Sequence, residues 1–133
     1  MICLDTNIVI ALLTRRDHRI AELFRASAPG ELAVPVQVVT ELWYGVWRSG
    51  RVRENRKRLA IFFNAPVEVL PFDVHDAREA GEIRAHLKRA DTPIGAYDLL
   101  IAAQARRRNA TLATSNVKEF AHVPGLAVEN WAA

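Results

Sequence analysis

The chain has 133 residues, of which half are hydrophobic and a quarter are charged, and its formal net charge is +3. This composition is typical of a globular domain with one buried core, and it excludes disordered, fibrous and collagen-like proteins. The one cysteine, Cys3, excludes an internal disulfide and agrees with a reducing, cytoplasmic environment. We therefore expect residues 1–133 to form a single domain.

Strand-like and helix-like segments alternate along the chain. The N-terminal apolar run lacks a basic region and is interrupted by Asp5, so we expect neither a signal peptide nor a membrane-spanning helix. In chain order we expect a strand over Met1–Asp5, helices over Asn7–Thr14 and Asp17–Ala28, a strand over Leu32–Val34, helices over Val36–Ser49 and Val52–Phe63, a strand over Val67–Leu70, a helix from the cap Asp73 to Arg89, a helix over Ala96–Arg107, and strands over Thr111–Thr114 and Ala127–Glu129. This alternation predicts a three-layer α/β/α sandwich around a mostly parallel central sheet.

Three acidic residues stand out because each interrupts an apolar run. Asp5 ends the first strand, Glu41 lies within a helix, and Asp98 lies in the first turn of another helix. A carboxylate in such surroundings destabilises a fold unless it is paired or binds a metal. Asp5 and Thr114 both lie at strand ends, and ligands of open α/β sheets bind beyond the carboxyl ends of the strands.

Each of the three acids also has a simpler structural explanation. Asp5 is suited to cap the next helix, Asp98 to complement a helix dipole, and Glu41 to occupy a solvent-exposed stripe. Taken together, the three favour a site for a hard cation such as Mg²⁺, which needs oxygen ligands and neutralises crowded carboxylates. Such a site hydrolyses phosphodiesters without a nucleophilic side chain, and the sequence has no convincing Ser–His–Asp or Cys–His set.

Four segments around these residues resemble the motifs of PIN domains. They are Leu4–Asn7, Thr40–Gly45, Thr92–Ala102, and Thr114–Phe120 with the tail segments Val123–Leu126 and Glu129–Trp131. In this order they extend over nearly the whole chain, which resembles VapC-type toxins, the enzyme half of VapBC toxin–antitoxin pairs.

The resemblance implies a PIN-like, Rossmann-like fold and an endoribonuclease that depends on Mg²⁺, or on Mn²⁺, and is neutralised by a VapB-like antitoxin. It implies that Asp5, Glu41 and Asp98 bind the metal and act in catalysis, with Asn116 at the fourth catalytic position. Many PIN domains have Asp there, whereas Asn offers an oxygen ligand without charge, which leaves one or two bound metals open. The group suggests tRNA as the RNA substrate, with ribosomal or messenger RNA as alternatives, and its members usually form homodimers.

Thr6 and Thr114 match hydroxyl-bearing positions of the family. They are suited to orient carboxylates or water, and equally to make ordinary hydrogen bonds at strand ends. The stretch Arg48–Arg58 contains six basic residues and one acid, so Arg51 and Arg53 suit contact with RNA phosphate or with the antitoxin. A second basic cluster, Arg106–Arg108, suits a solvated helix end that complements the dipole.

Three aromatic residues, Trp43, Tyr44 and Trp47, give one helix more aromatic surface than a core-facing stripe requires. Because large apolar patches and aromatic residues are typical of interfaces, we expect Val36–Ser49 and the next helix to form a groove for an antitoxin segment. The alternative is that all three aromatic side chains lie in the core.

Two other functions remain open from the residues. A haloacid-dehalogenase-like phosphatase also begins with an Asp at the end of its first strand, but it usually needs a second Asp where this chain has Asn7. A catalytically impaired PIN-fold domain that only binds RNA is the other alternative, and Asn116 is its support.

Overall fold

The computed structural model describes residues 1–133 and contains one five-stranded sheet. Its strands are β1 (Ile2–Leu4), β2 (Leu32–Pro35), β3 (Glu68–Leu70), β4 (Thr111–Thr114) and β5 (Ala127–Asn130). They lie in the order β3-β2-β1-β4-β5, and every neighbouring pair is parallel. The sequence predicts a mostly parallel sheet, and the sheet is parallel throughout.

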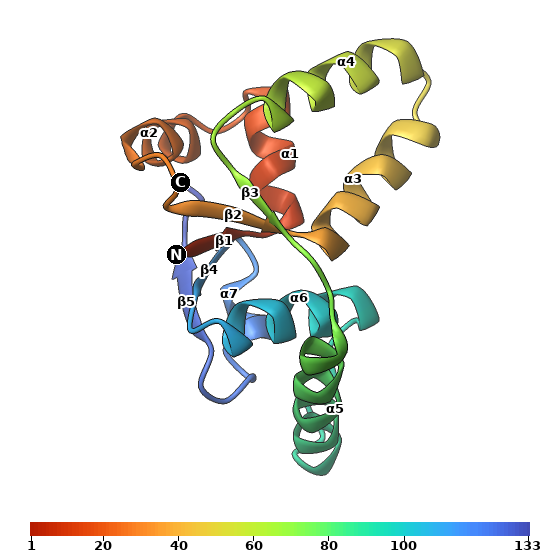
Figure 1. Cartoon of the computed structure of the whole chain (residues 1–133), viewed down its shortest axis with the longest axis vertical. Helices are drawn as coiled ribbons and strands as arrows, with labels where there is room; N and C mark the ends of the chain where they lie inside the picture. The colour runs from red at the N-terminus through yellow and green to blue at the C-terminus, as the bar shows by residue number, and fades with distance from the viewer.

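Seven helices cover the two faces of this sheet. They are α1 (Thr6–Thr14), α2 (His18–Ala26), α3 (Val36–Trp47), α4 (Val52–Phe63), α5 (Val74–Arg89), α6 (Ala96–Arg107) and α7 (Val117–Phe120). In Figure 1, α1 to α4 lie above the sheet and α5 to α7 lie below it. The predicted three-layer α/β/α sandwich is therefore confirmed. None of these helices combines the length and the apolar character that a membrane crossing needs.

Most of the expected elements are present within a residue or two. The largest difference is α7, which the sequence analysis omits because four residues are too short to show helical periodicity. Pro35 closes β2, where it is aligned with Leu70, whereas we expect it to stop the strand one residue earlier. A proline is tolerated at such a strand end because the ladder needs no amide donor there.

The order of the strands places a crevice at the centre of the sheet. The chain winds from β1 towards β3 on one side and continues through β4 and β5 on the other. The neighbouring strands β1 and β4 thus mark the point where the winding reverses, which is where open α/β sheets bind ligands. Asp5 follows β1 directly and Thr114 ends β4, so both residues lie at this crevice.

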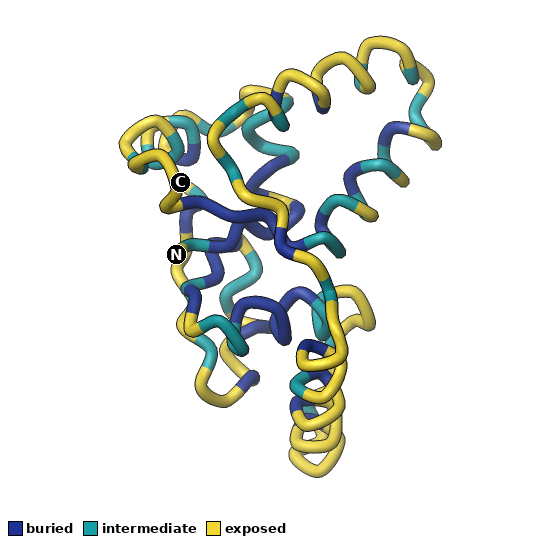
Figure 2. The backbone as a smooth tube through the Cα atoms, viewed as in Figure 1, coloured by how far each residue is buried: buried dark blue, intermediate teal, exposed yellow.

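The core is continuous across the sheet. Figure 2 shows buried backbone along β1, β2 and β4, and along the sheet-facing parts of the helices. Cys3, Ala33 and Leu112 lie side by side in the three central strands and are fully buried. The centre of α6, Ile101–Ala105, is also fully buried, which holds this helix firmly beneath the crevice.

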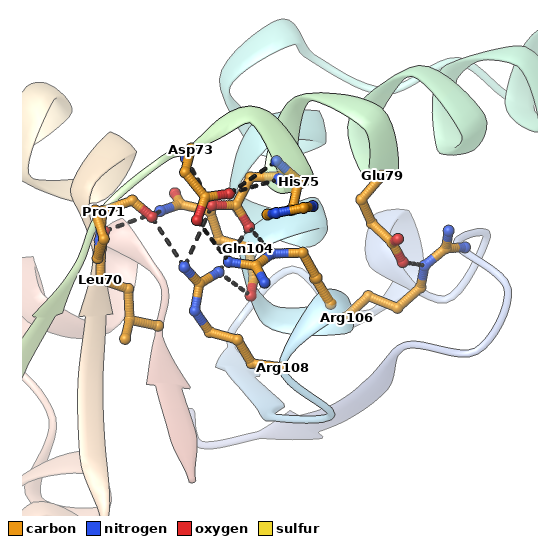
Figure 3. Close-up of polar contacts among 10 residues, drawn as sticks. Leu70, Pro71, Asp73, His75, Glu79, Gln104, Arg106 and Arg108 are labelled. Carbon is orange, nitrogen blue, oxygen red and sulfur yellow. Dashed lines mark hydrogen bonds and ion pairs between the residues drawn. The ribbon is translucent and has the colours of Figure 1, made fainter.

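An ion cluster fixes the C-terminal end of α6 against α5 (Figure 3). Arg107 and Arg108 both donate to Asp76, whose side chain is fully buried. Arg106 donates to Glu79 at 2.6 Å, while Gln104 donates to two carbonyls of the segment before α5. The expectation that the arginine triplet forms a solvated helix end is wrong, because all three side chains pair with acids across the α5–α6 contact.

Candidate active site

Asp5 lies at the crevice and is held there from two sides. Its Oδ1 accepts a hydrogen bond from the backbone amide of Thr6 at 2.8 Å, which caps α1, and its Oδ2 accepts one from the Thr114 hydroxyl at 2.7 Å. The residue is only 3% exposed. Burial raises the pKa of Asp5, and these two hydrogen bonds offset part of that effect. The capping role and a role in the site are therefore compatible in this residue.

Glu41 reaches the same crevice from α3. Its Oε1 accepts a hydrogen bond from the Thr6 hydroxyl at 2.7 Å, and the charge of Glu41 contributes to raising the pKa of Asp5. The side chain is half-buried, so the solvent-exposed stripe is the wrong description of its position. Gly45, one turn further along, has open space where a Cβ would be, which leaves room beside the carboxylate. Thr6 thus links the first two carboxylates.

Asp98 enters the crevice from the first turn of α6. Burial raises the pKa of Asp98 to about 7, and the charges of Glu119, Asp5 and Glu41 contribute in the same direction. Four carboxyl groups from distant parts of the sequence therefore lie within electrostatic reach of one another. No Lys, Arg or His forms an ion pair with any of the four.

Glu119 is the member of this group that the sequence analysis does not select. It lies on α7, where its Oε1 accepts a hydrogen bond from the Gly95 amide at 3.2 Å and its Oε2 accepts one from the Asn116 side chain. Asn116 itself is anchored by its backbone amide, which donates to the Thr114 hydroxyl at 2.9 Å. In this structure Asn116 therefore positions a fourth carboxylate, three residues further along. An acid one helical turn after the fourth motif position is the signal that could have identified it.

The remaining candidates lie outside this carboxylate group. Arg51 occupies the N-cap position of α4 and pairs with Glu54, and Arg53 is exposed in the first turn of that helix. Both residues lie beyond the far end of α3, which at helical spacing ends about 9 Å along its axis from Glu41. They belong to the tip of the arm that α3 and α4 form in Figure 1.

The four carboxylates form an open site. No three His, Cys, Asp or Glu side chains are arranged as a preassembled metal-binding group. Their donors are all oxygen, which suits hard cations such as Mg²⁺ and Mn²⁺, and Mg²⁺ usually binds through one or two carboxylates while it keeps several waters. Burial and, after it, the neighbouring carboxylates raise the pKa of both Asp5 and Asp98, and no basic side chain pairs with either. The residues present therefore fit a divalent cation.

An acidic, oxygen-lined crevice at the centre of a parallel sheet suits an enzyme that hydrolyses phosphate esters with a divalent metal. The comparison with protein families agrees, since the PIN domain model matches residues 2–126. The chain is 36% identical to Ribonuclease VapC2 of Rickettsia felis over 129 residues, which cover 96% of both chains. It is 35% identical to the tRNA(fMet)-specific endonuclease VapC of Salmonella typhimurium over 130 residues, again with 96% of both chains covered.

Solved structures show the same likeness. VapBC2 from Rickettsia felis, crystallised on a DNA fragment from its promoter, contains a chain with a TM-score of 0.92 and 35% identity, with 98% of this chain and 99% of that one covered. The DNA-bound VapBC from Salmonella typhimurium gives a TM-score of 0.92 at 33% identity, with 98% of each chain covered. This chain therefore belongs to the PIN domain family and, within it, to the VapC ribonucleases.

The family match shows that the phosphatase alternative is wrong for this chain. The alternative of an impaired, non-catalytic PIN domain rests on Asn116 alone. That support disappears because Glu119 supplies a carboxylate beside it.

Proposed function

We propose that the chain is the toxin of a type II toxin–antitoxin system, a Mg²⁺-dependent endoribonuclease in which Mn²⁺ can replace Mg²⁺. The observation that carries this proposal is the group of uncompensated carboxylates at the β1–β4 crevice. Asp5, Glu41 and Asp98 would hold the cation, and Glu119 would be the fourth carboxylate, positioned by Asn116.

The side chains of this site have distinct tasks in the proposed reaction. When bound, a divalent cation stabilises negative charge on the scissile phosphate and lowers the pKa of water. Thr114 and Thr6 keep Asp5 and Glu41 oriented, because each donates its hydroxyl to one of these carboxylates at 2.7 Å. Asp98, with a pKa of about 7, gives up its proton near neutral pH and then becomes available as a ligand.

The proposed substrate is tRNA, and the proposed protein partner is a VapB-like antitoxin. The tRNA proposal is supported by a relative that is named a tRNA(fMet)-specific endonuclease, and the antitoxin proposal by neighbours that are VapBC complexes. Because cellular RNA is the substrate, we place the protein in the cytoplasm. We also propose that residues 1–133 act as one PIN domain that pairs as a homodimer.

A groove between α1, α2 and α4 is the proposed seat of the antitoxin. It is lined by apolar side chains that include Leu12, Phe24 and Ile61, and it is flanked by Arg25 and Arg58. The sequence analysis places such a groove on α3 and α4. Of these two helices, α4 contributes to the lining of this groove and α3 does not.

Cleavage of tRNA by the purified chain tests the proposed site. We expect cleavage with Mg²⁺ and Mn²⁺, none after chelation by EDTA, and none from Asp5→Asn or Asp98→Asn, while both variants keep the native circular dichroism spectrum. Glu22→Gln, on the exposed side of α2, is the matched control and should cleave normally. Full activity of either aspartate variant would refute the metal site.

A further inference from the structure

Tyr44 is a large aromatic side chain that the fold does not need. It is 67% exposed, and the residues through which α3 enters the core are Val38, Leu42 and Val46. The guanidinium of Arg48 lies 5.5 Å from the centre of the Tyr44 ring. The alternative that all three aromatic residues of α3 are buried is therefore wrong for Tyr44, and equally wrong for Trp47, which is 59% exposed.

The position of Tyr44 around α3 relates it to the carboxylate site. At about 100° per residue, Tyr44 lies roughly 60° and Arg48 roughly 20° around the helix from Glu41. All three side chains thus share one face, on which Tyr44 is about 4.5 Å and Arg48 about 10.5 Å further along the axis. Because α3 leads away from the sheet in Figure 1, this face runs from the crevice outwards along the arm.

The two tryptophans of the same helix are placed differently. Trp43 and Trp47 lie roughly 160° and 120° around α3 from Glu41. Their rings stack on each other with centroids 5.5 Å apart, and Arg56 of α4 lies 5.9 Å from the Trp47 ring. Both tryptophans belong to α3, and Arg56 links the Trp47 ring to α4, so these rings have partners within the arm and point away from the carboxylates.

We propose that Tyr44 and Arg48 position the RNA substrate, with Tyr44 stacking on an unpaired base next to the scissile phosphate and Arg48 contacting the neighbouring backbone. The inference rests on the proposed active site, because the direction of the RNA path is defined from Glu41. Aromatic rings bind bases of single-stranded RNA through their faces, and arginine adds both charge and stacking. The six basic residues of Arg48–Arg58 extend the positive charge further along the arm, which suits RNA phosphate.

A stacking platform one helical turn from Glu41 can use only a base that has left its helix, so cleavage should occur in a loop or another unpaired segment. Antitoxin binding by the same face is the competing occupant. It is less favoured because the basic charge of the arm complements phosphate.

Fluorescence of 2-aminopurine in a single-stranded RNA, measured with EDTA present so that no cleavage occurs, tests the stacking. Wild-type protein should quench the fluorophore, and Tyr44→Ala should bind the RNA roughly 5- to 100-fold more weakly with little quenching. Tyr44→Phe and Tyr44→Trp should restore both properties. Trp47→Ala is the matched control, since it removes an equally exposed ring outside the proposed path, and its affinity should stay within about twofold.

Steady-state cleavage of a tRNA(fMet) transcript with Mg²⁺ supplies the second measurement. Tyr44→Ala should raise KM by a similar factor and change kcat less, and Arg48→Gln should flatten the salt dependence of KM while Arg48→Lys preserves it. An unchanged affinity and KM in Tyr44→Ala would overturn the inference, as would a loss of affinity confined to the antitoxin. If wild-type protein binds and quenches the RNA but cleaves no tRNA with any divalent metal, the proposed function fails separately from the stacking.

Discussion

The buried ion cluster between α5 and α6 leads to a prediction of measurable size. The fully buried side chain of Asp76 accepts hydrogen bonds from Arg107 and Arg108, both at 2.7 Å, and from the backbone amide of Asp73 through its other oxygen. Burial alone would raise the pKa of Asp76, but the hydrogen bonds from the two arginines outweigh burial and lower the pKa from 3.8 to about 2. The folded state therefore favours the charged form of Asp76 more strongly than the unfolded state does.

The size of the effect follows from the two pKa values. The difference between 3.8 and about 2, at about 1.4 kcal/mol per pKa unit, corresponds to about 2.5 kcal/mol of stability. Because the folded pKa is the lower one, this stability is almost fully present above about pH 5 and is lost as the pH falls through about 2. By the same relation, about half of this stability remains at about pH 3.

Asp76→Asn keeps the shape of the protonated carboxyl but cannot ionise. Urea unfolding followed by circular dichroism should show a loss of about 2 kcal/mol at neutral pH that narrows to about 1 kcal/mol near pH 3. Asp91→Asn is a suitable control, because Asp91 forms no ion pair and its φ of 58° is one that Asn tolerates well. A loss that is the same at every pH would mean that Asp76 acts through packing, and the electrostatic reasoning would be refuted.

The carboxylate group allows two further tests, and the arm allows a third. The pKa of Asp98 is raised to about 7, so ionisation of this side chain opposes folding. Asp98→Asn should therefore raise the melting temperature in EDTA, and more at pH 8 than at pH 4. An equal rise at both pH values would contradict this electrostatic explanation. Thr114→Val removes the hydroxyl that donates to Asp5 and should slow cleavage by about tenfold or more. Thr111→Val, on the same strand, is the control and should not slow cleavage. Equal activities of these two variants would remove Thr114 from the site. The last set replaces three arm residues with glutamine: Arg51, Arg53 and Arg56. If they contact RNA, the salt dependence of binding should flatten, and an unchanged slope would assign them to solvent or to the antitoxin.

The positions of the three selected acids were predictable from the sequence because their surroundings are unusual. Asp5, Glu41 and Asp98 each interrupt an apolar segment, and parallel strands bring their carboxyl ends to one edge of a sheet. The boundaries of α4 and α6 match the expected residues because α4 is amphipathic and α6 follows the Pro93–Gly95 break.

Features that depend on tertiary partners were less accessible. Glu119 lies in a polar segment on a helix too short to show a pattern, and only the folded chain brings it beside Gly95. The pairing of Arg106–Arg108 with the acids of α5 depends on how two helices pack, which local sequence does not encode. Trp47 has core-facing spacing on α3, yet it lies in the arm outside the core, where it contacts Trp43 and Arg56 and stays largely exposed.

The hydrogen bonds of the site explain how four repelling carboxylates are kept together. Thr114 of β4 holds Asp5, Thr6 of α1 holds Glu41, and the amide of Gly95 before α6 holds Glu119. Each bond joins two segments that are distant in sequence. The fold therefore sets the positions of these oxygens, and it does so against their mutual repulsion. A cation that enters the crevice would relieve this repulsion and would draw the carboxylates closer together, because they are not preassembled as a metal-binding group.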